Sequence, residues 1–237
     1  MISYRQATEA EAAEIITWAK EEGWNPGLAD ATPYFRADPQ GFFVAASAGD
    51  GAVAVISVVN HGPDVAHLGH YIVRPAYRGK GIGLALWNHA LAHAGSRVVG
   101  LDGVEAQQGN YVKSGFEHTG GTTRFEGQLT PESAPTIRRI RAEDVEQLIA
   151  KEAAACGSAK PAFLRAWFED HDHRLTLIDD ASGAFCAVRR CEVGSKFGPF
   201  HAGSELAARA LLAHAATLFE GPFVIDVPDA KTDLRAL

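Results

Sequence analysis

The segment at residues 71–83, which reads YIVRPAYRGKGIG, constrains the fold of this chain more than any other. A β-branched run stops at Pro75, and three glycines within five residues then lead into a helical pattern. Glycines at such a turn leave backbone N–H groups uncovered, and the following helix N-terminus adds positive potential there. Arg78 and Lys80 add formal positive charge. The segment predicts a phosphate or pyrophosphate site, which the agreement of cations, glycines and periodicity favours over a plain fold junction.

Two other phosphate-binding motifs do not fit this turn. A P-loop requires Ser or Thr directly after its Gly-Lys pair, but Gly81 follows Lys80. A dinucleotide fingerprint requires a third glycine after the first strand of a βαβ unit, and Leu84 and Leu86 stand where it would fall.

The turn resembles the pyrophosphate-binding signature Q/R-x-x-G-x-G/A of the GNAT acyltransferase superfamily. Arg78, Gly81 and Gly83 fill its fixed positions, and Val73 with Pro75 fits the strand that normally precedes it. The resemblance implies an α/β (α+β) fold of the GNAT type, with a mixed central sheet flanked by helices. It also implies acetyl-CoA as co-substrate and no metal ion.

Periodicity and turn residues predict the order β-α-α-β-β-β-α-β-α-β-β over residues 1–127, which is the GNAT layout. Thr8 and Glu11 predict a capping box for the first helix. Residues 116–118 and 122–126 are expected to pair as a hairpin around two glycines. Residues 1–127 are therefore interpreted as an acyl-CoA-binding catalytic domain.

The second half of the chain repeats the pattern without the phosphate turn. Residues 128–135 read as a linker, and residues 136–237 form a second, smaller domain. Within it, residues 198–202 and the helix that follows match the position of residues 74–77 and their helix. This domain resembles the degenerate C-terminal domain of one bacterial branch of tandem GNAT proteins; the alternative is an unrelated α/β domain.

The second repeat is incomplete when judged by sequence, because its closing strands would run past Leu237. Either the chain is short there or another segment covers the open strand edge. Since an uncovered edge promotes association, a homodimer contact at this end is expected.

By the resemblance, backbone groups of Ile72 and Val73 contact the pantetheine arm. The backbone N–H groups expected to hold the pyrophosphate are those of Arg78, Gly79, Lys80, Gly81, Ile82 and Gly83.

Tyr111 is the candidate acid that protonates the leaving thiolate. Residues 111–116 read YVKSGF and match the superfamily's Tyr-x-x-x-Gly-Phe, although Val104 replaces the usual asparagine seven positions earlier. A phenol with an ordinary pKa near ~10 is protonated at neutral pH and can donate. The alternative is a packing role for Tyr111.

Several polar residues are candidates for handling the amine. His67, on the fourth strand, is the candidate base, and its ordinary pKa of about 6.5 suits that role. His70 is expected on the opposite face by strand alternation. The predicted acceptor-binding residues are Trp24, Asn25, Asp30 and Asp102, whose alternatives are a core or turn-capping role.

Composition limits the remaining classes. The formal net charge is −7 and no long basic block occurs, so nucleic acid is not an expected partner. No apolar run approaches the roughly 20 residues that span a bilayer, and no export signal is apparent, so no membrane association is expected. Three cysteines cannot all pair, which fits a cytoplasmic location.

These features favour an N-acyltransferase that moves an acetyl group from acetyl-CoA to a primary amine of a small molecule or peptide, by direct attack in a ternary complex. An acyl-CoA-binding sensor or partner-binding module without turnover is the alternative from another class. In a third possibility, the second domain recognises the acceptor.

Overall fold

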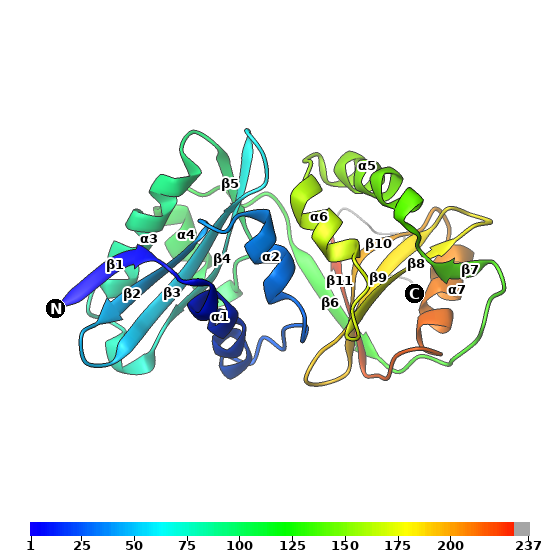
Figure 1. Cartoon of the computed structure of the whole chain (residues 1–237), viewed down its shortest axis with the longest axis horizontal. Coiled ribbons are helices and arrows are strands. Elements are labelled where there is room, and N and C mark those ends of the chain that lie inside the picture. The colour runs from blue at the N-terminus through cyan, green and yellow to red at the C-terminus, as the bar shows by residue number, and fades with distance from the viewer. Residues whose placement is uncertain (230–237) are drawn as a thin grey trace. The chain divides into compact units, whose positions relative to one another are not determined.

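The computed structural model describes residues 1–229 and divides the chain into two units. The first unit comprises Met1–Pro26, Asp30–Asp102 and Ile149–Trp167. The second comprises Gly27–Ala29, Gly103–Leu148 and the described residues from Phe168 onward. Each unit is built on a mixed sheet with helices packed on it (Figure 1), as the sequence predicts.

The first unit contains a five-stranded sheet in the order β1-β2-β3-β4-β5. The first four strands are antiparallel neighbours, and β5 runs parallel to β4. The strands are β1 (Ile2–Gln6), β2 (Phe42–Ser47), β3 (Gly51–Asn60), β4 (Val65–Val73) and β5 (Val98–Leu101). The helices packed on them are α1 (Glu9–Glu21), α2 (Ala31–Ala37) and α3 (Ile82–Leu91).

Strand alternation places apolar side chains on both faces of this sheet. On one face, Ile15 and Trp18 of α1 pack with alternate strand residues such as Val44, in a cluster that α2 joins. On the other face, Phe43 contacts two histidine rings, one of which is His89 of α3. Figure 1 shows α1 and α2 on the side of the sheet opposite α3. Because Val44 is buried on one face of the sheet and Phe43 on the other, β2 is held between α1 and α3.

The helix α1 begins as the sequence predicts. The Thr8 side chain accepts from the Glu11 N–H at 3.3 Å, and the Glu11 carboxylate accepts from the Thr8 N–H at 2.9 Å. Arg5 donates two hydrogen bonds of 2.8 Å to the same carboxylate.

A β-bulge interrupts β4. Val55 pairs with Ile72, but Ser57 pairs with Gly69, so two residues of β4 oppose one residue of β3. His70 adopts the left-handed conformation there, with φ of 50°. Because the extra residue shifts the alternation by one, the prediction that His70 faces away from His67 is wrong.

β4 and β5 are neighbours over only part of their length. The paired residues run from Val65 with Val98 to Leu68 with Leu101. Beyond Leu68, among the described residues, no strand pairs with β4 on that side. From Gly69 to Val73, this edge of β4 is therefore open only in the sense that no described strand pairs with it, since the Val73 carbonyl accepts a hydrogen bond from the Arg78 side chain.

The second unit contains a six-stranded sheet in the order β6-β11-β10-β9-β8-β7. Its strands are β6 (Thr122–Gly127), β7 (Ile137–Arg139), β8 (Arg174–Asp179), β9 (Phe185–Arg190), β10 (Ser195–His201) and β11 (Phe223–Pro228). Helix α7 (Glu205–Ala215) packs through Leu211 and Ala215 into a cluster with Leu177 and Val188. Helix α4 (Gln108–Lys113) also belongs to this unit, whereas α5 (Val145–Cys156) from Ile149 onward and α6 (Pro161–Phe168) up to Trp167 belong to the first unit.

The expected hairpin between residues 116–118 and 122–126 does not form. Residues 116–118 are irregular, and β6 instead pairs antiparallel with β11, from Thr122 opposite Pro228 to Gly127 opposite Phe223. A bidentate Arg124–Asp226 ion pair at 2.7 and 2.8 Å joins these two strands. The strand therefore belongs to the second sheet, whereas the proposed domain boundary at residue 127 stays a prediction.

The same pairing answers the question of the open strand edge. The edge of β11 that the sequence leaves uncovered is paired with β6. An uncovered edge of β11 therefore gives no reason to expect a dimer contact there, and a homodimer itself stays a prediction. Residues 230–237, where the second repeat was expected to break off, lie outside the described part of the chain.

The internal repeat of the sequence is visible in the second unit. β10 and β11 are parallel, as are β4 and β5, and β10 also carries an irregularity, between Phe197 and Phe200. Residues 198–201 lie within β10 itself, so their predicted match to the turn after β4 is wrong. Residues 198–201 instead correspond to the bulged part of β4.

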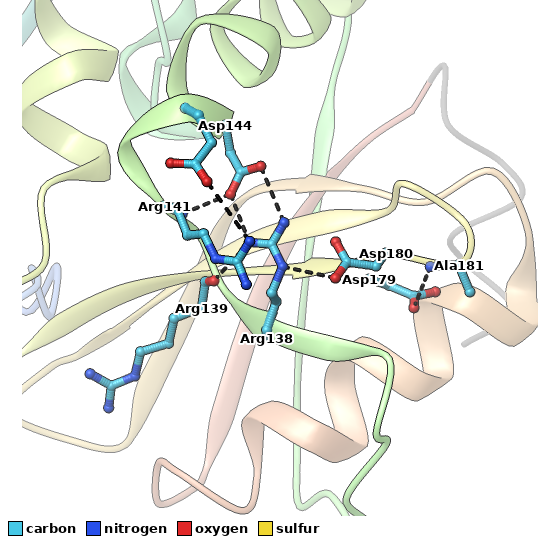
Figure 2. A network of polar contacts seen from close by, with 8 residues as sticks. Arg138, Arg139, Arg141, Asp144, Asp179, Asp180 and Ala181 are labelled. Atoms are coloured by element: carbon cyan, nitrogen blue, oxygen red, sulfur yellow. Dashed lines mark hydrogen bonds and ion pairs between the residues drawn. The ribbon is translucent and has the colours of Figure 1, made fainter.

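An arginine-centred network joins β7 to a later turn of this unit (Figure 2). Arg138 donates to Asp144 at 2.7 and 3.2 Å and to Asp180 at 2.8 Å. The Arg141 N–H also donates to Asp144, at 2.7 Å. The hydrogen bonds from Arg138 are the main reason that the pKa of Asp144 is lowered. Because Arg138 and Asp180 are 42 residues apart in sequence, their hydrogen bond fixes β7 against the β8–β9 turn.

Candidate active site

The turn between β4 and α3 has the geometry that its sequence predicts. After a short 3-10 turn at Pro75–Tyr77, Gly79 and Gly81 take φ of 72° and 75°. This left-handed conformation favours glycine, because a β-carbon would clash with the backbone. Gly81 is the N-cap of α3 and provides no side-chain cap.

The backbone donors at this turn are open. Among the described residues, the N–H groups from Gly79 to Leu84 donate to no protein carbonyl, whereas Ala85 N–H donates to Gly81 at 3.0 Å. The Arg78 N–H donates a hydrogen bond to the Pro75 carbonyl at 3.2 Å, so the run of open N–H groups begins one residue later than predicted. A helix N-terminus with consecutive free donors and a positive dipole end is suited to an anion such as a diphosphate.

The two cations of the turn differ in their surroundings. The Arg78 guanidinium folds back, donating to the Val73 carbonyl at 2.7 Å and to Glu22 at 2.6 Å. Lys80 lies over the ring of Tyr77, with its ammonium 5.3 Å from the ring centre. Arg78 therefore braces the turn, and its charge is partly neutralised by Glu22.

Gly83 is required for a different reason from the other glycines. A β-carbon on it would lie 2.5 Å from the Tyr71 hydroxyl and 2.9 Å from a methyl of Val73. The first turn of α3 thus packs directly on the end of β4. Ile72 is buried in the core, so only its backbone can contact a ligand along the open edge of the strand.

A cavity of about 200 Å³ lies in the same unit, beside the bulge of β4. Among the predicted residues it is lined by His67, Trp24 and Asp102, while Asn25 and Asp30 do not line it. Trp24 is 37% exposed, so it does not fill the core. The other lining residues are Tyr34, Ser57, Val59, His61, Leu68, Gly69 and His70.

Three imidazoles in this cavity are held in the neutral form. Burial is the main cause in each case, and it lowers the pKa of His61 and of His70 to about 4. The pKa of His67 is also lowered by burial and by Lys160, while Asp102, 3.9 Å away, opposes the shift. Ser57 Oγ lies 3.0 Å from His70 Nδ1 and so orients that ring.

Tyr111 lies on α4, in the second unit, where its half-buried ring meets Phe116 edge-on with 6.4 Å between ring centres. Burial raises the pKa of its phenol, which is therefore protonated at neutral pH. Gly115, with φ of 89°, follows this helix in the left-handed conformation that commonly ends helices. Its role as an acid stays a prediction.

The cavity contains residues that the sequence analysis missed, namely Tyr34, Ser57 and His61 as well as His70. His61, His67 and His70 lie within ten residues of one another in the sequence, and this cluster could have indicated that they share a site. The bulge that aligns two of them depends on the register of β3, which alternation alone does not reveal.

Comparisons with known proteins identify the class. The acetyltransferase (GNAT) family matches residues 9–116, and a second acetyltransferase (GNAT) domain matches residues 148–237. A holothin acyltransferase from Pseudoalteromonas sp. (strain SANK 73390) is 34% identical over 205 residues, covering 85% of this chain and 69% of that protein. The chain belongs to the GNAT acyltransferase family and carries two GNAT domains.

Solved structures share the fold. An acetyltransferase-family protein from Pyrococcus horikoshii matches with a TM-score of 0.80 at 21% identity, covering 99% of this chain and 82% of that one. A tandem GNAT protein from the clavulanic acid biosynthesis pathway matches with a TM-score of 0.58 at 14% identity, covering 98% and 91%. The tandem arrangement thus recurs among its structural neighbours.

Two further properties concern the described part of the chain only. Within residues 1–229, no helix is both long and apolar enough to cross a bilayer. The same residues contain no group of three or more His, Cys, Asp or Glu side chains arranged to hold a metal ion.

Proposed function

We propose that this protein catalyses transfer of an acetyl group from acetyl-CoA to a primary amine, by direct attack in a ternary complex. The observation that carries this proposal is the run of open N–H groups from Gly79 to Leu84, at the N-terminus of α3 and beside the open edge of β4. The residues present fit CoA: the donors suit its diphosphate, and the part of β4 that has no strand beside it suits its amide-containing arm. The acyltransferase relative supports the same reading.

The reaction then requires two proton transfers. The amine nitrogen forms a bond to the thioester carbon as the carbon–sulfur bond breaks, the nitrogen loses a proton, and the sulfur accepts one. His67 is proposed to take the proton, because it is neutral and lines the cavity. Tyr111 is proposed to supply the other, because its raised pKa keeps the phenol protonated.

The primary test combines calorimetry with a thiol-release assay. Acetyl-CoA should bind to the isolated protein, and a panel of primary amines should accelerate CoA release. Binding without amine-dependent release would favour the alternative, a non-catalytic acyl-CoA sensor. Absence of binding would overturn both.

Tyr111→Phe tests the acid. Loss of a positioned acid should lower kcat by about 100-fold, with the Kd for acetyl-CoA within twofold of the parent protein. Tyr4→Phe, on β1, is the matched control and should change neither. Equal losses in kcat and affinity for Tyr111→Phe would refute the role.

His67→Ala tests the base. If His67 accepts the proton, kcat/KM of the parent protein falls as the pH drops through its lowered pKa, below about 6.5, and the variant loses this acidic limb. His61→Ala and His70→Ala are the comparison set, since both imidazoles line the same cavity. An unchanged pH profile in His67→Ala eliminates it.

A further inference from the structure

The walls of the cavity are dominated by rings. Five of its ten lining residues carry an aromatic or imidazole ring, namely Trp24, Tyr34, His61, His67 and His70. Tyr34 meets His70 edge-on, with 5.7 Å between ring centres. Flat faces and edges of this kind favour a flat ligand, because stacked and edge-on ring contacts add to the gain from burial.

A helix from beyond the linker supports these rings. Phe163 of α6 lies 4.8 Å from Tyr34 and 5.8 Å from His61, measured between ring centres. It also stacks on Trp167, one helical turn later, at 5.1 Å. Residues 149–167 belong to the first unit, so α6 completes the support of this cavity. Phe163 is therefore a positioning residue for two of the rings that line it.

Burial disfavours a positive charge on the three imidazoles of the cavity. The charged neighbours have opposite signs: Lys160 disfavours protonation of His61 and His67, Asp38 favours that of His61, Asp102 that of His67 and Asp30 that of His70. Burial outweighs all of them, and each imidazole stays neutral. An alkylammonium group placed against these rings would lose solvation in the same way, although the Asp102 carboxylate, 91% exposed in the cavity lining, would offset part of that loss.

The volume also limits the ligand. At about 200 Å³ the cavity is smaller than the roughly 300 Å³ at which pockets for drug-sized ligands begin. It therefore accommodates a one-ring or compact two-ring group with its amine.

We propose that this cavity is the acceptor site and that it selects a small, flat amine that is uncharged at neutral pH, an aryl or heteroaryl amine, with Phe163 positioning the rings that contact it. The inference rests on the proposed acyl transfer. An arylamine attacks without prior deprotonation, so a neutral imidazole has only to take the proton released as the carbon–nitrogen bond forms and the carbon–sulfur bond breaks.

Three amines of similar size separate flatness from charge. With acetyl-CoA at pH 7.5, aniline should show a kcat/KM at least tenfold above those of benzylamine, which has a flat ring but a cationic amine, and cyclohexylamine, which has neither property. A kcat/KM for either alkylamine that equals or exceeds that of aniline would overturn the proposal.

Phe163→Ala tests the positioning role. The KM for aniline should rise at least fivefold while kcat stays within twofold and the Kd for acetyl-CoA is unchanged, which also shows that the variant is folded. Phe163→Tyr should restore the parent KM, and Phe125→Ala, on β6 and outside the cavity lining, should leave it unchanged. An unchanged KM in Phe163→Ala, or an equal rise in Phe125→Ala, would contradict the role.

A binding measurement separates failure of this inference from failure of the proposed function. In saturation-transfer NMR with the CoA-saturated protein, aniline should receive saturation and cyclohexylamine should not, and Phe163→Ala should at least halve the aniline signal. If no amine is acetylated but this pattern holds, acyl transfer is wrong and the cavity assignment stands. Equal saturation of both amines would refute the cavity assignment even if acyl transfer occurs.

Discussion

The N-termini of α3 and α7 occupy equivalent places in their two units but differ in what they offer a ligand. Each helix follows a bulged strand that runs parallel to the next strand of its sheet. α3 begins at Gly81 without a side-chain cap, whereas α7 begins at Ser204, whose hydroxyl accepts from the Ala207 N–H at 3.2 Å. Glu205 adds a negative charge in the first turn of α7.

The difference shows that a few residues decide whether the shared fold can bind a diphosphate. A serine cap satisfies one of the donors that a phosphate would need, and an adjacent carboxylate opposes an anion through charge and the helix dipole. The glycine turn does the reverse, since it leaves the donors open and lets the ligand approach the backbone. The second unit has therefore kept the architecture without this binding device.

Gly81→Asp should have the largest effect, because it gives α3 the character of α7. Aspartate tolerates the left-handed conformation better than most residues, and nothing lies within 4 Å of the new β-carbon. The carboxylate would cap the open N–H groups and repel the diphosphate. We expect the Kd for acetyl-CoA to rise about 100-fold, or ~2.7 kcal/mol, in calorimetry.

Two controls divide this effect into its parts. Gly81→Asn keeps the cap without the charge and should fall between the parent and Gly81→Asp. Gly203→Asp places the same carboxylate just before α7 and should leave the Kd unchanged. Full-strength binding by Gly81→Asp would show that the N-terminus of α3 is not the diphosphate site.

Ser204→Ala should affect stability and leave CoA binding alone. Losing an N-cap costs about 1 kcal/mol, because the Ala207 N–H no longer has a side-chain acceptor. The measurement is urea unfolding, with the Kd for acetyl-CoA determined on the same sample. A changed Kd would mean that α7 takes part in binding, which would break the contrast between the two helices.

The N-terminus of α1 is also capped by side chains, Thr8 and Glu11, and its stabilisation should depend on pH. The hydrogen bonds from Arg5, followed by those from Thr8, lower the pKa of Glu11 from 4.5 to about 2. Its contribution to stability is therefore present above pH 4.5 and is lost as the pH falls from there toward 2. Glu11→Gln should cost about 0.8 kcal/mol at pH 6, a modest value because Arg5 is 45% exposed.

Unfolding curves of the parent and Glu11→Gln at several pH values provide the check. The two proteins should converge near pH 2, where the parent carboxyl becomes protonated. A difference that persists undiminished at that pH would mean that the carboxylate charge is not what stabilises α1.

Local features of the fold and site could be predicted from the sequence, and long-range ones could not. The glycine turn and the Thr8 capping box depend on neighbouring residues, and both are present. The pairing of β6 with β11 joins residues about 100 positions apart, and Phe163 and Tyr34, which are in contact, are still farther apart in sequence. Local patterns carry no information about such partners. The predicted hairpin of residues 116–118 and 122–126 was therefore wrong, and the contact of Phe163 with the cavity rings was missed.

The bulge of β4 shows how one such long-range fact changes a site. Alternation assigns His67 and His70 to opposite faces, but the register with β3 places a bulge between Gly69 and Ile72 that includes His70, and both histidines line the cavity. Pairing on both strands had to be known before the cavity could be described.

The smallest expected effect concerns Glu22, which tempers the positive potential of the α3 turn. Its carboxylate pairs with Arg78 at 2.6 Å, and the two side chains are 34% and 51% exposed, so water screens much of the interaction. Glu22→Gln would leave the open N–H groups intact and free the guanidinium charge. We therefore expect acetyl-CoA to bind about threefold more tightly at low salt, a gain of ~0.6 kcal/mol that high salt should remove. Glu14→Gln, at an exposed position of α1, the helix that Glu22 follows as C-cap, removes an equal charge and should change the Kd less. Weaker binding by Glu22→Gln would show that the ion pair serves to hold the turn in shape, and that its bracing outweighs the charge it neutralises.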